Sequence, residues 1–165
     1  MSFIDTHCHL DAAYFPEGVG APLERARAAG VNSFVVVGVG ETLGAARHAV
    51  TLAETHAEIR AVVGVHPHDA RVLDDAMLDE LRLLANRKEV VAVGEIGLDY
   101  HYDHSPREVQ RAAFTRLIAL AREVKKPIVV HTREAARDTL ELLASEGARD
   151  VGGIIHCFSE DIDFA

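Results

Sequence analysis

The stretch Phe3-Ile4-Asp5-Thr6-His7-Cys8-His9-Leu10 opens the chain and indicates its fold, because it reads as a β-strand whose far end carries two histidines. Side chains alternate between the two faces of a strand, so we expect Asp5, His7 and His9 on one face. Neutral imidazole is a ligand for transition metals such as zinc. Two histidines at one strand end therefore predict half of a metal site, which needs further ligands from elsewhere in the chain.

The rest of the chain alternates short β-branched segments with amphipathic segments of helical period. Strands are predicted at residues 3–7, 33–37, 60–65, 90–95, 128–131 and 153–156. Helices are predicted at residues 22–29, 42–55, 74–86, 106–124 and 134–145. Nearly continuous apolar strands separated by helices indicate a parallel sheet covered by helices, which is the α/β class.

The helix after residue 105 has the clearest predicted start. Ser105 is placed to cap it, Pro106 suits its first turn, and Glu108 completes a Ser-x-x-Glu capping box. We therefore expect the Ser105 side chain to bond to the backbone of this helix.

Two architectures fit the alternation, an open doubly wound sheet and a (β/α)8 barrel. Chemistry-bearing residues end five of the predicted strands. An open sheet concentrates its site at one switch point, whereas a closed barrel brings every strand end to one mouth. We therefore predict a TIM-type barrel that forms a single domain over residues 1–165. Such barrels take roughly 250 residues, so six βα units lead us to expect a C-terminally incomplete barrel.

Composition narrows the class of protein. The 165 residues are 48% apolar and carry a net charge of -9, which predicts a globular protein without a basic surface for nucleic acid. A phosphate substrate remains compatible with this charge, because bound cations supply local positive charge. We see no apolar run of roughly 18 residues and no signal peptide. Two cysteines make no disulfide framework, so we expect a cytoplasmic protein.

The candidate ligands are four imidazoles and one carboxylate, each at a predicted strand end: His7, His9, Glu95, His131 and His156. The two oxygens of a carboxylate can each bind a different cation, so we expect Glu95 to bridge a binuclear divalent site and to be its catalytic residue. Paired metals about 3.5–4 Å apart activate water and clamp both oxygens of a displacement. The alternative is a set of independently satisfied polar groups, which five residues in one topological position make improbable.

Other residues at the same mouth have weaker assignments. We expect His66 and Arg133 to bind substrate phosphate, because the planar fork of arginine suits phosphate oxygens; a structural ion pair is the alternative for Arg133. Tyr100 is predicted either to bind substrate or to support the loop that carries Glu95. We expect Asp5 to hydrogen-bond a ligand imidazole, as metal-binding histidines usually require.

Five motifs occur in order along the chain, namely Asp5-x-His7-x-His9, Gly64-x-His66-Pro67-His68, Gly94-Glu95-Ile96-Gly97-Leu98-Asp99-Tyr100, Pro127-x-x-x-His131-x-Arg133 and His156-Cys157-Phe158-Ser159. Together they resemble the TatD family of metal-dependent deoxyribonucleases, which belongs to the amidohydrolase-like barrel superfamily. The resemblance implies one metal at His7, His9 and Glu95. It implies a second metal at His131 and His156, again with Glu95. The family's remaining ligand is an aspartate in a Glu-Thr-Asp motif that this sequence does not contain.

The ligand set and the resemblance predict a hydrolase that uses two divalent ions, of magnesium, manganese or zinc, to cleave DNA. The resemblance implies 3'-5' exonuclease action on single-stranded DNA or DNA ends. Single-strand binders often add aromatic stacking platforms, for which the loops offer Tyr14, Phe15, Tyr100 and Tyr102. We expect no membrane partner, and a monomer for the complete protein.

Two other functions remain open. Related barrels bridge their metals with a carbamylated lysine on strand four, where this chain has Glu95 and no lysine. That difference favours the nuclease but leaves open an amide or ester hydrolase such as a D-aminoacyl-tRNA deacylase. The third interpretation is an inactive metal-binding fragment, whose first and last strands would expose apolar edges and favour pairing.

Overall fold

The computed structural model describes residues 2–165, in which six parallel strands pair in sequence order. The strands are β1 (Phe3–Cys8), β2 (Val31–Gly38), β3 (Ile59–Val63), β4 (Val90–Asp99), β5 (Ile128–Arg133) and β6 (Gly153–Ile155). The six strands confirm the predicted segments. β4 and β5 extend four and two residues beyond the predicted ends at Glu95 and His131, and β6 stops before His156.

Helices connect consecutive strands, as the sequence predicts. They are α1 (Gly20–Ala28), α2 (Gly44–Thr55), α3 (Asp75–Ala85), α4 (Arg107–Val124) and α5 (Ala136–Ser145), with 3-10 turns η1 (Pro67–Val72) and η2 (Ala148–Asp150). None of the helices in residues 2–165 combines the length and the apolar composition that crossing a membrane requires.

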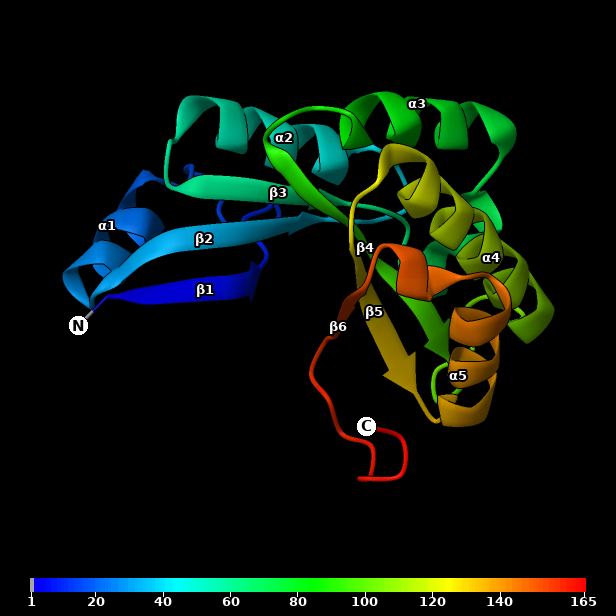
Figure 1. Ribbon diagram of the computed structural model, residues 1–165. Helices are drawn as coiled ribbons and strands as arrows, with labels where there is room; N and C mark the ends of the chain where they lie inside the picture. Colours follow the sequence, from blue (N-terminus) through cyan, green and yellow to red (C-terminus); the bar gives the residue numbers. More distant parts are fainter. Residues whose placement is uncertain (1) are drawn as a thin grey trace.

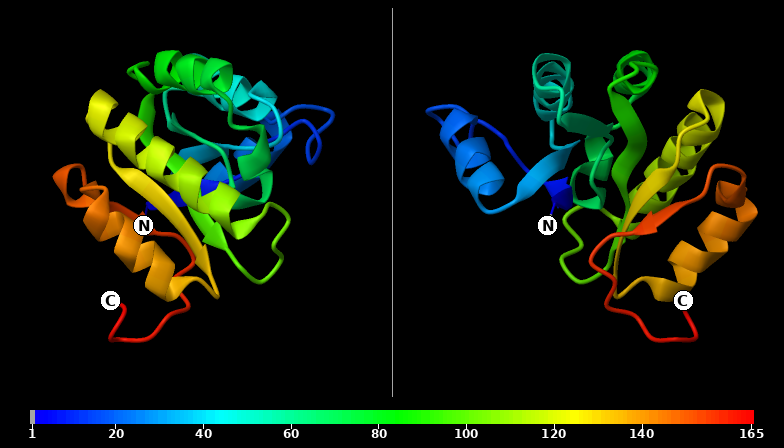
Figure 2. Two further views of the ribbon diagram at one scale, coloured as in Figure 1. Left: turned by 90° about the vertical axis from the view of Figure 1, so that its right-hand side faces the viewer. Right: turned by 60° about the vertical axis from the view of Figure 1, so that its left-hand side comes forward.

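The sheet curls into part of a barrel, with the helices on its convex side (Figures 1 and 2). Its order β1-β2-β3-β4-β5-β6 has no reversal, and a doubly wound sheet would need one at its switch point. The structure therefore confirms the prediction of a partial TIM-type barrel. β1 and β6 are the two edges of this sheet.

Two apolar layers stabilise the curled sheet. The larger layer lies between the sheet and the helices and contains Val93, Ile96 and Phe114. The smaller layer lies on the concave side and consists of Val37, Val62, Ala92 and Val129. Burial of apolar surface in both layers, at roughly 25 cal/mol per Å², holds the strands in one register.

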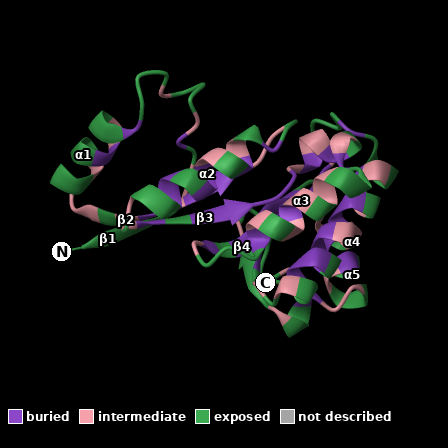
Figure 3. Cartoon of the chain, turned by 90° about the horizontal axis from the view of Figure 1, so that it is seen from above, coloured by how far each residue is buried: buried purple, intermediate pink, exposed green. Residues whose placement is uncertain are grey.

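Burial is uneven across the sheet, as Figure 3 shows. Every residue of β4 except Val91 is buried, whereas no residue of β1 is buried. The edge strands expose large apolar side chains, with Ile4 on β1 64% exposed and Ile154 on β6 53% exposed. The centre of the sheet thus forms a rigid core between two lightly packed edges.

A register shift in β4 decides which way Glu95 points. Ala92 and Ile96 are an even number of residues apart, yet Ala92 lies in the concave layer and Ile96 lies in the layer under the helices. Between Gly94 and Ile96 the pairing with β5 skips a residue, so Glu95 is the extra residue of a bulge. Strict alternation from Ala92 would turn Glu95 under the helices, and the shift turns it to the concave side.

The predicted capping box at the start of α4 is wrong. The residue before α4 is Pro106, and no side chain caps the helix. Instead the buried hydroxyl of Ser105 donates to the carbonyl of His68 at 2.8 Å and accepts from the backbone N–H of Arg71 at 3.3 Å. Ser105 therefore fastens the loop before α4 to η1, because tertiary partners compete with the local cap.

Candidate metal centre

Glu95 is the residue around which the concave mouth is built. Its carboxylate is buried, with Oε2 3.4 Å from Nε2 of His7 and Oε1 3.1 Å from Nδ1 of His131. Oε1 is also 3.8 Å from Nε2 of His66 and 3.8 Å from Nε2 of His156. Four imidazoles from distant parts of the chain thus surround one carboxylate. Three of them, His7, His131 and His156, are among the predicted ligands, and the fourth is His66 rather than His9.

The nitrogen and oxygen atoms form two groups that share Glu95. One group joins Glu95 to His7 and His156, whose rings stack with centroids 3.5 Å apart. The other group joins Glu95 to His66 and His131. A shared carboxylate between two sets of imidazoles is the arrangement expected of a bridging ligand.

His9 lies outside both groups, so the structure does not place it where the family resemblance implies. β1 ends at Cys8, and its pairing with β2 shifts between Asp5 and Cys8. Alternation is guaranteed only within a regular strand, so it does not fix the position of His9. The His9 ring still meets the His7 ring edge to face, with centroids 5.2 Å apart. His9 is exposed and lines a neighbouring cavity with Asp11.

Asp99, rather than Asp5, is the carboxylate that contacts an imidazole of this centre. Oδ2 of Asp99 accepts from Nε2 of His131 at 3.1 Å and from Nε2 of His68 at 2.9 Å. The prediction for Asp5 is wrong, because its carboxylate accepts the backbone N–H of His7 at 3.1 Å and so supports the strand. A metal-binding histidine usually donates its second N–H to a carboxylate, and Asp99 provides that contact for His131.

Asp99 is itself held by a buried glutamine. Gln110 on α4 accepts the backbone N–H of Asp99 at 2.7 Å and donates to the carbonyls of Asp99 at 3.0 Å and Ser105 at 2.8 Å. The other oxygen of Asp99 accepts the N–H groups of His101 and Tyr102. The side chains of Asp99 and Gln110 are fully buried, so this hydrogen-bond network fixes the end of β4.

These contacts set the charge of the central groups. Burial opposes ionisation of Glu95, but contacts with His131 and His7 outweigh burial and hold the pKa of its carboxyl well below its usual range. Burial lowers the pKa of His66 to about 3. At neutral pH the centre therefore presents an ionised carboxylate, which suits cation binding, and an uncharged His66 ring, which does not repel a cation.

The geometry fits divalent cations. Because Nε2 of His131 donates to Asp99, its Nδ1 lone pair faces the Glu95 carboxylate at 3.1 Å in the neutral ring. Two electron-rich atoms at this distance need a positive charge between them, either a proton or a metal ion. Both ring nitrogens of His7 are buried and have no hydrogen-bond partner among residues 2–165, although Nε2 lies 3.4 Å from Oε2 of Glu95. An unpaired buried polar group costs about 1–3 kcal/mol. A cation bound beside Glu95 would remove the repulsion between Glu95 and Nδ1 of His131, and it would give a ring nitrogen of His7 a partner.

His66 differs from the other rings, because its tautomer is fixed by the backbone. Nδ1 of His66 accepts the N–H of His68 at 3.2 Å, so the neutral ring carries its proton on Nε2. That N–H faces Glu95 and His131. His66 is thus arranged to donate a hydrogen bond into the centre, which is compatible with the predicted contact to a substrate phosphate.

Arg133 and Tyr100, the other two predicted substrate residues, have different surroundings in the structure. The guanidinium of Arg133 lies 4.8 Å above the ring of Tyr102 and makes no salt bridge with another residue in the range 2–165. The alternative of a structural ion pair is therefore not observed for Arg133. Tyr100 turns away instead, because its hydroxyl donates to Asp138 of α5 at 2.7 Å. Tyr100 therefore supports the loop after β4, which is the second of the two roles predicted for it.

The aromatic residues predicted to stack on bases differ in their exposure. Phe15 is half-buried against the core under the helices. Tyr14 and Tyr102 are 71% and 50% exposed beside the mouth. Only these last two are available to bases of a bound strand.

The sequence left the roles of Asp99 and His68 open, and it gave no indication of a role for Gln110. Asp99 lies in the Gly-Glu-Ile-Gly-Leu-Asp-Tyr run, so its place after Glu95 was the signal that could have found it. The role of Gln110 could not be predicted from the sequence, because a glutamine in an amphipathic helix is usually exposed on the polar face. Only the packing of α4 on β4 brings it to Asp99.

Comparison with known proteins identifies relatives of the chain. A family model described as "TatD related DNase" matches residues 4–165. The uncharacterized metal-dependent hydrolase YabD of Bacillus subtilis is 40% identical over 161 residues, which are 98% of this chain and 62% of YabD. A protein of Enterobacter lignolyticus named 3'-5' ssDNA/RNA exonuclease TatD is 34% identical over 155 residues, which are 94% of this chain and 59% of that protein.

Solved structures give the same relationship. The TatD homologue YjjV of Escherichia coli superposes with a TM-score of 0.88 at 32% identity, over 99% of this chain and 62% of YjjV. The phosphotriesterase homology protein of Escherichia coli has a TM-score of 0.58 at 15% identity, over 88% of this chain and 59% of that protein, which supports the fold alone. The chain spans about 62% of the length of YabD and of YjjV.

Proposed function

Because the chain belongs to the TatD related DNase family, we propose that it carries the metal centre of a hydrolase that cleaves phosphodiester bonds at the ends of single-stranded DNA. The observation that carries this proposal is the buried Glu95 carboxylate between four imidazoles, in two groups that share it. The name of the Enterobacter relative supports a 3'-5' direction and admits RNA as a second substrate.

The ligands we propose are His7, Glu95, His131 and His156, with Glu95 as the bridge. Two divalent ions, of magnesium, manganese or zinc, would supply an activated water and charge neutralisation for the phosphoryl oxygens. Glu95 contributes its negative charge and keeps the two sets of imidazoles together. Asp99 holds the ring of His131 so that Nδ1 points at the centre.

The substrate phosphate would contact the rim of the same centre. Nε2–H of His66 faces the mouth, and the guanidinium of Arg133 has no ion-pair partner within residues 2–165. A planar guanidinium binds two phosphate oxygens at once, which positions the scissile bond. The single domain over residues 1–165, the monomeric state and the cytoplasmic location remain predictions from the sequence.

The test is hydrolysis of single-stranded DNA labelled at the 5' end, with EDTA and then with each divalent metal added back. We expect metal-dependent shortening from the 3' end, lost on Glu95→Gln. The matched control is Glu123→Gln on the exposed face of α4, which should cleave as the parent chain does.

A parallel assay with p-nitrophenyl acetate tests the competing ester hydrolase. Metal-dependent ester cleavage without DNA cleavage would reject the nuclease in favour of the acyl substrate class. Metal binding measured by calorimetry, with neither activity, would favour the inactive metal-binding interpretation.

A further inference from the structure

The cavity that His9 and Asp11 line adjoins the metal centre at the ends of β1, β2 and β3. Its volume is about 570 Å³, within the range of about 300–1,000 Å³ that small-molecule sites occupy. His66 lines this cavity and also contacts Glu95, so the two spaces share one side chain. A group attached to a phosphate at the metal centre would therefore reach the cavity directly.

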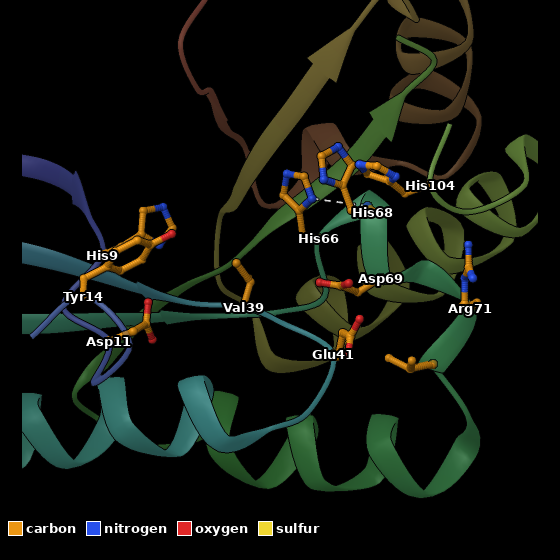
Figure 4. A pocket seen from close by; sticks show the side chains of 11 residues that line it. His9, Asp11, Tyr14, Val39, Glu41, His66, His68, Asp69, Arg71 and His104 are labelled. Atoms are coloured by element: carbon orange, nitrogen blue, oxygen red, sulfur yellow. Dashed lines mark hydrogen bonds between the residues drawn. The ribbon is translucent and has the colours of Figure 1, made fainter. Parts of the chain in front are cut away.

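Rings form two opposite walls of the cavity (Figure 4). Tyr14 and His9 stand on one side, and His66, His68 and His104 stand on the other. His68 and His104 meet edge to face, with centroids 4.6 Å apart. Flat rings on two sides are suited to a flat aromatic guest, because stacking contributes about 1–3 kcal/mol per base.

Carboxylates form the remaining polar lining. Asp11, Glu41 and Asp69 all face the cavity, and Arg71 is the cation at its far end (Figure 4). None of the three carboxylates makes a hydrogen bond or a salt bridge through its oxygens to another residue of the described chain. Burial, and then the nearby charge of Glu41, raise the pKa of Asp69. Three carboxylates and one guanidinium leave the lining with an excess of negative charge. This charge disfavours a phosphate group and favours a guest with N–H donors.

We propose that this cavity binds the base of the nucleotide whose phosphate lies at the metal centre, and that it prefers bases with an exocyclic amino group to thymine. The proposal rests on the proposed function, since it names what the same site accepts. Stacking between the ring walls holds the base, and the carboxylates accept hydrogen bonds from its amino group.

The base preference follows from donor chemistry. Adenine, cytosine and guanine each carry an amino group with two N–H donors, whereas thymine carries carbonyl oxygens and a methyl group. The single ring N–H of thymine lies between two carbonyl oxygens. A carboxylate that accepted this N–H would face both carbonyls, and their repulsion weakens the contact.

The test uses free deoxynucleosides, because they carry no phosphate and need no metal. Deoxyadenosine, deoxycytidine, deoxyguanosine and thymidine are titrated into the chain in EDTA, and the ring protons of the histidines are followed by NMR. We expect shifts at His9, His68 and His104. The three amino-bearing nucleosides should bind about tenfold more tightly than thymidine, as one hydrogen bond to a charged group predicts.

Variants connect the preference to the carboxylates. Asp69→Asn and Asp11→Asn should each reduce the preference over thymidine while thymidine binding stays within about twofold. Asp79→Asn on α3, whose partner is Arg82, is the matched control and should keep the full preference. Tyr14→Ala should weaken all four nucleosides alike, because stacking does not distinguish bases.

Two results would overturn the inference. One is equal binding of thymidine and the other nucleosides, and the second is shifts that miss the histidines of the cavity. Shifts caused by an amino acid methyl ester but by no nucleoside would assign the carboxylates to an ammonium group instead. Since the titration is done without metal, its failure leaves the DNA hydrolysis assay as an independent test of the proposed function.

Discussion

The inner strands (β3, β4 and β5) and the edge strands (β1 and β6) supply the same centre from different surroundings. Glu95 and His131 stand on inner strands, where Asp99 and the buried core fix their positions. His7 and His156 come from the edges, where the neighbouring side chains of Ile4 and Ile154 are exposed. A region with few packed contacts needs little free energy to move locally, and the edge strands are such regions. We therefore expect the inner ligands to be preorganised and the edge ligands to be fixed by the cation itself.

The largest expected effect is on the residue that joins both regions. Glu95→Gln removes the shared charge and leaves the inner and edge imidazoles without a bridge. We expect metal affinity, measured by calorimetry, to fall by more than the roughly 10–100-fold that loss of an outer contact costs. Glu123→Gln should bind metal unchanged. Retention of both cations by the Gln variant would show that the two regions bind metal independently.

A pair of glycines compares the packing of the two regions directly. Gly97 on β4 has φ +142°, and an added Cβ would lie 2.0 Å from the carbonyl oxygen of His131. Gly152 before β6 has φ +66°, and an added Cβ would meet no atom within 4 Å. We expect Gly97→Ala to lower the free energy of unfolding by roughly 3 kcal/mol or more, and Gly152→Ala by about 1–2 kcal/mol. Urea denaturation measures both, and equal losses would contradict a rigid centre with lightly packed edges.

A pair of aspartates tests which carboxylate orients a ligand. Asp99→Asn weakens the acceptor of His131 and His68, so metal affinity should fall about 10–100-fold. Asp5→Asn on the edge strand alters only a contact to the backbone of His7 and should change affinity by about twofold or less. Competition with a chelating dye measures both variants. A larger effect from Asp5 would transfer the orienting role to the edge.

The smallest expected effect lies at the sheet edge. Ile4→Thr replaces a side chain that is 64% exposed, so the free energy of unfolding should change by no more than about 0.5 kcal/mol. Ile59→Thr makes the same change on β3, where the residue is fully buried, and should cost about 2 kcal/mol. A large loss from Ile4→Thr in denaturant melts would mean that β1 is covered in solution.

Much of the architecture followed from the sequence. Local periodicity predicted six strands and five connecting helices, and the structure contains all of them. The ligand types at strand ends also predicted that His7, His9, Glu95, His131 and His156 would meet, and all of them except His9 lie in the two groups around Glu95. These features depend on short-range patterns and on the rule that parallel strands end at one edge.

The sequence by itself therefore determined the class of fold, the order of its elements and the composition of the centre. Tertiary structure decided the rest: the bulge that turns Glu95 inward, the end of β1 that leaves His9 outside, and the contact between Asp99 and His131. The physical reason is that side-chain alternation is a local property, whereas register is set by the neighbouring strand. A shift of one residue in that pairing moves a carboxylate from one face of the sheet to the other.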